Sequence, residues 1–202
     1  MTESTNPPAN ATRRQQILDT AAAVFAEKGI ASTTVRDISE QVGIYSGSLY
    51  HHFKSKEEIV AGILEPVVAS QVAALEHITS TTNDPVEILS QAVVAAVAQT
   101  AANPVAARIL QQNGSQLSKY RGLDDLVVQR RSLRTAIETV IVDGVAAGAF
   151  RADVDPKVAA TAYFDGVVGA YRHLAPAGDH DVTTLAQQLI AITVLGLCPH
   201  AR

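Results

Sequence analysis

One short stretch of the chain, Gly43–Phe53, gathers side chains that donate hydrogen bonds at close range. Its sequence, GIYSGSLYHHF, holds two tyrosines, two histidines and two serines in about three helical turns. Hydroxyl and imidazole groups suit phosphate oxygens and other polar surfaces, and Gly47 lets the backbone approach such a surface closely. Leu49 and Phe53 lie four residues apart and form a narrow apolar edge. We therefore expect a short helix that is pinned along one edge and faces outward elsewhere.

The elements around this segment are predicted to be helices, because apolar residues recur at helical spacing and no alternating strand pattern is found. Helices are expected at 13–28, 35–42, 46–53, 56–79, 85–101, 104–113, 124–147, 156–170 and 183–197, with a loop at 115–122. Ser46 is the expected N-cap of the third helix, and Ser55 with Glu58 follows the capping-box pattern at the fourth. The predicted fold is all-α, with about nine helices: three short ones and then a larger bundle.

The proportions of the first three helices are those of a helix-turn-helix, in which the last helix enters the major groove of DNA. The charge is unusual for such a role, since the formal net charge is −4. Over residues 1–58, six Lys and Arg side chains stand against seven Asp and Glu side chains. A DNA-binding surface would therefore depend on the local arrangement of charges.

Composition excludes several other classes. The single Cys198 and the six scattered histidines show no ligand spacing, so we expect neither a metal site nor a cofactor. No unbroken apolar run reaches about 18 residues, and the polar start has no secretory signal, so a cytoplasmic protein without a membrane span is expected. We divide the chain into a disordered tail (1–11), a helix-turn-helix domain (12–54) and a ligand-binding and dimerisation domain (55–202).

The segment TTVRDISEQVGIYSGSLYHHFKSKEEIV, Thr33–Val60, closely resembles the DNA-binding head of the TetR family of transcriptional repressors. The resemblance covers roughly 13–63, and it includes Gly29, Gly43, Phe53 and the Ser55-Lys56-Glu57 motif. Beyond residue 64 it is limited to the helix count and to the GAFRADVDP turn. It implies a repressor that binds double-stranded DNA, with these contact residues: Thr34, Arg36, Tyr45, Ser46, Gly47, Ser48, Tyr50, His51, His52 and Lys56.

The resemblance also implies a homodimer that reads two operator half-sites, and a small effector that binds in the larger bundle. Small residues in 156–170 and apolar residues in 183–197 suit packing across a two-fold axis, although the same stripes would serve an internal core. The stretch ILQQNGSQLSKYRGLDDLV is similar to regulators of lipid and steroid breakdown, whose effectors are often CoA thioesters. An acyl-CoA-like effector is thus expected first and another hydrophobic compound second. The expected lining residues are Leu64, Val68, Ile109, Gln112, Asn113, Gln116, Tyr120, Arg130, Arg134, Tyr163 and Tyr171.

Other interpretations of these features stay open. Arg130, Arg131 and Arg134 either bind an anionic ligand or pair with neighbouring acids on a solvated helix face, and the charge pattern alone favours pairing. Tyr50 would be a core residue in another context, and His51 is as consistent with a plain surface histidine. A DNA-binding architectural protein without an effector is a further alternative. A helical-bundle enzyme has no recognisable catalytic motif in its favour.

Overall fold

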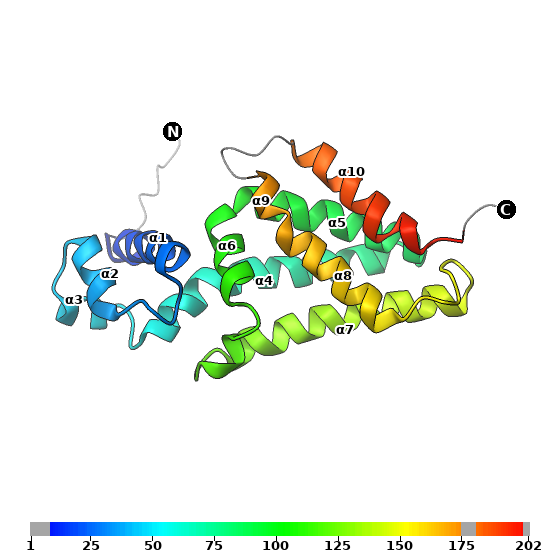
Figure 1. Cartoon of the computed structure of the whole chain (residues 1–202). Coiled ribbons are helices and arrows are strands. Elements are labelled where there is room, and N and C mark those ends of the chain that lie inside the picture. Colours follow the sequence, from blue (N-terminus) through cyan, green and yellow to red (C-terminus); the bar gives the residue numbers. More distant parts are fainter. Residues whose placement is uncertain (1–8, 175–180, 200–202) are drawn as a thin grey trace, which may run out of the picture.

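The computed structural model describes residues 9–174 and 181–199, and all regular structure within them is helical, as predicted (Figure 1). The described part of the chain forms α1 (Ala9–Lys28), α2 (Val35–Val42), α3 (Ser46–Tyr50), α4 (Lys56–Thr81), α5 (Pro85–Ala102), α6 (Pro104–Asn113), η1 (Leu117–Lys119), α7 (Asp124–Ala146), α8 (Pro156–Gly169), α9 (Tyr171–Leu174), α10 (Val182–Thr193) and η2 (Leu195–Leu197). The first helix begins at Ala9 rather than at Arg13, and most of the predicted tail lies outside the described residues.

Capping chemistry fixes the bounds of α2. The Thr34 side chain accepts a hydrogen bond from the Asp37 N–H (3.1 Å), and the Asp37 carboxylate accepts one from the Thr34 N–H (2.8 Å). This reciprocal box satisfies backbone donors that the first helical turn leaves without partners. At the other end Gly43 takes a left-handed conformation (φ 74°), which a side chain would strain. The turn into α3 therefore starts where the sequence predicts.

The start of α3 differs from the prediction, because Ser46 is not its N-cap. Tyr45 has the extended backbone of the N-cap residue and makes no capping hydrogen bond. Ser46 is already helical, and its hydroxyl lies 2.9 Å from that of Ser39 on α2. The apolar edge is confirmed, since Leu49 and Phe53 are buried. This short helix is held by two apolar anchors and one hydroxyl pair, with its other sides left outward.

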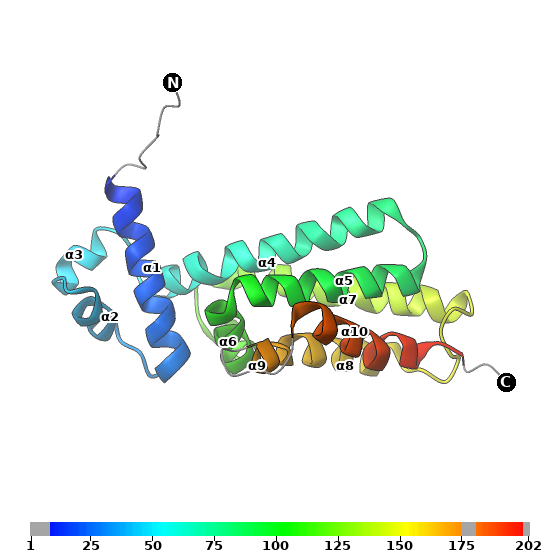
Figure 2. The ribbon, with the colours of Figure 1, turned by 90° about the horizontal axis from the view of Figure 1, so that it is seen from above.

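The long α4 connects the head (α1–α3) to the rest of the molecule. The Ser55 side chain accepts from the Glu58 N–H at 3.1 Å, as predicted, but Glu58 reaches back to the N–H of Lys54 (2.7 Å) rather than to that of Ser55. Pro66 lies inside the helix and removes one backbone donor there. In Figures 1 and 2, α4 runs from the head along the length of the bundle beside α5.

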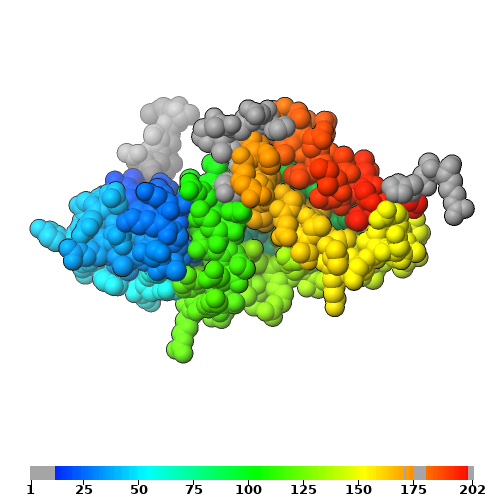
Figure 3. All heavy atoms as spheres, in the orientation of Figure 1, coloured from blue at the N-terminus to red at the C-terminus, as the bar shows by residue number. Residues whose placement is uncertain are grey.

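Two separate apolar cores follow one another along α4. The first, called the proximal core, joins the head to α6 and the start of α7: Ile17, Leu18, Ala21, Phe25, Ala26, Ile30, Ile38, Leu49, Phe53, Ile59, Val60, Leu64, Val68, Ala106, Ile109, Leu110, Leu117, Leu123 and Leu126. The second, called the distal core, joins α4, α5, α7, α8 and α10, and includes Leu75, Ile78, Leu89, Val93, Val97, Ile137, Ile141, Phe150, Tyr163, Val167 and Leu185. Figure 3 shows α6 packed directly against the head, between it and the distal bundle.

By length and composition, α4 and α5 would each be able to cross a bilayer. In each helix 28% of the apolar window is buried inside the chain, and these buried residues belong to the two cores. The helices of a packed bundle can pass the same test of length and composition, so two such helices are weak evidence for a membrane span.

Candidate nucleic-acid interface and effector cavity

The outward face of α3 carries most of the predicted DNA contacts. Tyr45 is 88% exposed and Tyr50 is 53% exposed, and no atom stands within 4 Å of a Cβ added to Gly47. Ser48 and His51 are also exposed, whereas Ser46 and His52 are half-buried at its edge. This face lies at the far end of the head from the bundle (Figures 1 and 2). It offers hydroxyls, imidazoles and two phenol rings to an approaching surface.

The start of α2 provides one cation beside this face. Arg36 is exposed, and its Nε donates to the Glu40 carboxylate at 2.7 Å. That hydrogen bond and the carboxylate charge raise the pKa of Arg36, which stays protonated. The bond uses Nε, so the terminal guanidinium nitrogens remain available as donors. The Thr34 hydroxyl is taken up by the capping box, and any contact of Thr34 with DNA has to share that group.

Lys56 is turned toward the protein. Its Nζ donates to the carbonyl oxygens of Ile30 (2.7 Å) and Thr33 (2.9 Å), and so it closes the turn between α1 and α2. An ammonium group has three donors, which leaves one for an external acceptor. The sequence motif pointed to a phosphate contact but not to this internal role, since the carbonyl partners lie more than twenty residues away.

Asp37 is a further charged group of the head. Hydrogen bonds from the Thr34 side chain and backbone, together with Lys28 at 3.1 Å, lower the pKa of Asp37 far below its ordinary value. Asp37 therefore stays ionised and serves α2 as its N-terminal carboxylate. Asp37 therefore stabilises the start of α2, and it also places a negative charge near the proposed DNA interface.

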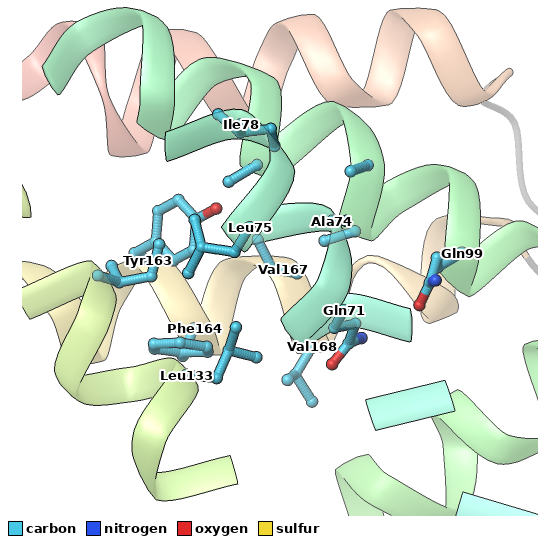
Figure 4. Close-up of a pocket in the computed structure, with 14 residues that line it drawn as sticks. Gln71, Ala74, Leu75, Ile78, Gln99, Leu133, Tyr163, Phe164, Val167 and Val168 are labelled. Atoms are coloured by element: carbon cyan, nitrogen blue, oxygen red, sulfur yellow. The ribbon is translucent and has the colours of Figure 1, made fainter. Parts of the chain in front are cut away.

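The distal core contains an apolar chamber of about 60 Å³ between α4, α5, α7 and α8 (Figure 4). Its walls are almost wholly apolar: Ala74, Leu75, Ile78, Ala92, Ala95, Ala96, Leu133, Ile137, Phe164, Val167 and Val168. Polar groups come from Tyr163, Gln71 and Gln99. Figure 4 shows Tyr163 on one side of the chamber and the two glutamines on the other. Burial raises the pKa of Tyr163, so its phenol stays protonated.

A larger hollow of about 460 Å³ adjoins the chamber and is lined by Arg130, Arg131 and Arg134. The two spaces share four residues of their walls: Gln71, Leu133, Phe164 and Val168. Within the described residues, none of the three arginines has a carboxylate within ion-pair distance, so the pairing that the charge pattern favoured is absent. Asp165 also lines the hollow, beyond ion-pair distance of the arginines, so three positive charges face one carboxylate there.

Arg130 is the most buried of the three arginines. Its guanidinium fits against Gly114 after α6, where an added Cβ would lie 2.5 Å from Nη1 and 2.8 Å from Nη2. The buried Nη1 has no hydrogen-bond partner. Burial and the nearby charge of Arg134 lower the pKa of Arg130. A buried donor without a protein partner is unusual, and this one belongs to a residue that lines the hollow, where a water molecule or an anion would supply the acceptor.

Arg134 lies at the boundary between the two spaces. Its guanidinium stacks on the Phe164 ring, 4.9 Å from the centroid, and donates to the Thr161 hydroxyl at 3.2 Å. Phe164 in turn meets Tyr163 edge to face, with 5.5 Å between ring centroids. A cation, an aromatic ring and a phenol therefore follow one another from the hollow into the chamber.

The predicted lining residues fall into several groups. Arg130 and Arg134 line the hollow and Tyr163 lines the chamber. Of the others, Leu64, Val68 and Ile109 are buried in the proximal core, Tyr120 packs against it, and Gln112 and Gln116 are exposed, so these six line neither space. The side chain of Tyr171 lies outside the described residues. Asn113 bridges the bundle and the head instead, because its Oδ1 accepts from the Ile30 N–H at 3.3 Å.

Sequence reasoning missed the two glutamines of the chamber. Gln71 continues the inward stripe of α4, between Val68 and Leu75, and Gln99 follows Ala92 and Ala96 on α5. The sequence did contain a sign of these residues, namely a glutamine at a position where the helix pattern predicts an apolar core residue. Burial of an amide is unfavourable without a hydrogen-bond partner, so such a glutamine indicates a polar contact or a ligand. Leu64 and Val68 lie on the same stripe but belong to the proximal core, whereas Leu75 belongs to the distal core. The sequence of α4 does not show where one core ends and the next begins, because that depends on the position of α6.

Comparison with known families decides the class of this chain. Residues 17–63 match the family of bacterial regulatory proteins called tetR, and residues 82–197 match the tetracyclin repressor-like C-terminal domain. The chain belongs to the TetR family. This TetR protein is a transcriptional repressor with a DNA-binding helix-turn-helix head, and its relatives are regulators rather than enzymes.

Relatives align with this TetR protein over nearly its whole length. The transcriptional repressor KstR2 of Rhodococcus jostii is 36% identical over 97% of this chain and 99% of its own. The structure of the ketosteroid transcriptional regulator KstR2 of Mycobacterium tuberculosis superposes with a TM-score of 0.82 at 31% identity, covering 93% of this chain and 96% of that one. The structure of AibR in complex with isovaleryl coenzyme A and operator DNA shares the fold, with a TM-score of 0.75 at 20% identity over 90% and 98% of the two chains.

Proposed function

We propose that this repressor is cytoplasmic, binds a palindromic operator as a homodimer, and is released from it by an acyl-CoA-like effector. The observation that carries the effector class is the apolar chamber beside a hollow whose wall holds three arginines and a single carboxylate, Asp165, with no ion pair between them. The names of the relatives support an effector from steroid or lipid breakdown, because KstR2 is a repressor and a ketosteroid regulator.

DNA contact is proposed through α3 and the start of α2. The exposed donors on Tyr45, Ser48 and Tyr50 suit base edges and phosphates, and Arg36 supplies charge. With so few cations on the head, we expect shape and hydroxyl contacts to matter more than counter-ion release, and the salt dependence to be modest.

A dimer is proposed through α8 and α10. Large apolar side chains stand exposed on these elements and on η2: Val158 (65%), Ile192 (71%) and Leu195 (52%). A second copy of the same surface would cover them across a two-fold axis. Two heads would then meet operator half-sites whose centres lie about 34 Å apart, or a multiple of that distance.

The effector is proposed to place its phosphates among Arg130, Arg131 and Arg134 and its acyl end in the chamber. Guanidinium groups bind phosphate oxygens bidentately, and Nη1 of Arg130 already lacks an acceptor. A chamber of about 60 Å³ holds only a few heavy atoms, so the acyl end has to widen it by moving α4 away from α8. Since α4 also belongs to the proximal core, that movement shifts the head.

A footprinting experiment tests this function. The DNA upstream of the protein's own gene is protected by the pure protein, and CoA thioesters of alicyclic acids are then added beside the free acids and beside free coenzyme A. We expect protection of two symmetric half-sites that the thioesters remove and the free acids leave in place. Release by the free acids at equal concentration would assign the hollow to another ligand class, and protection of a single asymmetric site would contradict the dimer.

A further inference from the structure

The apolar chamber holds a polar group that neither the fold nor the proposed phosphate contacts explain. Gln99, on α5, has a buried Oε1 that finds no hydrogen-bond partner. Its Nε2 donates to the hydroxyl of Ser70 on α4. Figure 4 shows Gln99 and Gln71 toward the opposite side of the chamber from Tyr163. Leaving a buried amide oxygen without a donor costs about 1–3 kcal/mol in proteins, so its retention calls for a role.

The position of Gln99 limits that role. Ala92, Ala95 and Ala96 of the same helix line the chamber with it and have small apolar side chains. The bond joins the amide of Gln99 on α5 to the exposed Ser70 of α4, so one end of the amide meets the surface while Oε1 is buried. Gln71 lines both the chamber and the hollow, and no hydrogen bond to its amide is found among the described residues.

We infer that Gln99 selects an effector whose apolar end carries a hydroxyl or keto oxygen, and rejects a plain hydrocarbon of the same shape. The inference rests on the proposed function for the rest of the effector. A hydroxyl group donates to Oε1 of Gln99 as the side chain stands. A keto group accepts from the amide nitrogen after the amide turns by 180°, since the Ser70 hydroxyl can donate to the oxygen as well as accept from the nitrogen. A hydrocarbon leaves the buried amide unpaired.

A trapped water molecule is the competing explanation for the unpaired oxygen. A chamber of about 60 Å³ has room for water, and Gln71 would give such a water a second polar neighbour. The two explanations differ in what they predict for ligands. If water satisfies Gln99 permanently, the chamber treats an alcohol and a hydrocarbon as any apolar cavity does, and the hydrocarbon binds more tightly because it costs less to take out of water.

The experiment uses small neutral probes that need no coenzyme A. Cyclopentanol, cyclopentanone and methylcyclopentane are titrated into the full-length protein, and binding is followed by NMR through the side-chain amide signals of Gln99 and Gln71. Gln99→Leu and Gln99→Met remove the amide, Ser70→Ala removes its support, and Gln91→Leu is the matched control on the exposed side of α5. We expect the wild type and the control to bind the alcohol and the ketone about tenfold more tightly than either Gln99 variant does, with the hydrocarbon unaffected or improved.

Equal preference for the hydrocarbon in the wild type and in the Gln99 variants overturns the inference, and so does the absence of binding by any probe. A second arm keeps the proposed function separate: cyclopentanecarbonyl-CoA and its 3-hydroxy and 3-oxo derivatives are compared in operator release. If all three release the operator equally from the wild type and from Gln99→Leu, the selectivity fails and the CoA assignment stands. If none releases it while the neutral probes still discriminate, the CoA assignment fails and the role of Gln99 stands.

Discussion

Arg130 offers the sharpest test of the effector site, because the structure predicts that removing it makes the protein more stable. Its Nη1 is buried without a partner and its neighbour Arg134 carries the same charge. A buried unpaired donor costs about 1–3 kcal/mol, and methionine has a similar length with no donor to satisfy. After allowance for lost contacts of the guanidinium with Gly114, we expect Arg130→Met to raise the free energy of unfolding by about 1 kcal/mol.

The assay is thermal unfolding by circular dichroism at a fixed protomer concentration, since a dimer melts at a temperature that depends on concentration. For a chain of this size, about 1 kcal/mol corresponds to an increase in Tm of roughly 2–4 °C. The matched control is Arg131→Met, whose parent side chain is exposed and whose stability should stay within about 0.5 kcal/mol of the wild type. The stabilised Arg130→Met protein should still protect its operator but should respond poorly to CoA thioesters.

A fall in Tm of similar size for Arg130→Met, with the control unchanged, would refute this reasoning. It would show that the contacts of Arg130 stabilise the protein without an effector, and that its guanidinium does not wait for an anion to satisfy it. A normal effector response in the stabilised variant would place the phosphates elsewhere in the hollow, on Arg131 and Arg134.

Three further outcomes follow from the interface, the dimer surface and the head. Tyr50→Ala should weaken operator and non-operator DNA binding at least about tenfold while leaving the dimer intact, since each protomer loses one hydrogen bond to a charged group; unchanged affinity in an anisotropy titration would move the docking surface. Ile192→Arg places a charge on an exposed apolar surface and should give folded monomers in sedimentation velocity, whereas a persistent dimer would relocate the interface. The pKa of Asp37 is lowered in the folded head, so its stabilising effect is complete above its unfolded value of 3.8 and is lost as the pH falls below it. Asp37→Asn should remove that part of the acid sensitivity, and an identical loss of helicity below pH 4 in both proteins would contradict the assignment.

Much of the head could be predicted from the sequence because its turns, helix caps and buried edges depend on residues that are close together in the chain. Gly43 marks a left-handed turn, Thr34 and Ser55 mark helix starts, and Leu49 with Phe53 marks the buried edge of α3. The misplaced N-cap at Ser46 shows the limit of such rules. Ser46 is the first residue of α3, and its hydroxyl pairs with that of Ser39 on α2 instead of capping the helix. Capping rules consider neighbouring residues only, so they do not predict this contact between two helices.

The effector cavity was predicted less well because its residues come from helices that are far apart in the chain. The arginines of α7 were recognised by type, but their lack of carboxylate partners depends on which helices surround them. Leu64 and Val68 have the spacing of lining residues and lie under the head instead. Asn113 was expected to meet a ligand, and its bond to Ile30 crosses more than eighty residues of sequence.

The proximal core has a consequence for building hybrid regulators from this chain. An exchange of heads at residues 54–55 would cut through a single hydrophobic cluster, since Ile17 and Phe25 pack in the same cluster as Ile109 and Leu126. A transplanted head would meet foreign side chains on α6 and leave voids or clashes in the joint. A working hybrid therefore needs α6 and the first turn of α7 to travel with the head. The practical boundary between modules then runs through the arginine-lined hollow, whose wall combines Leu110 and Gly114 with Arg130 and Arg134.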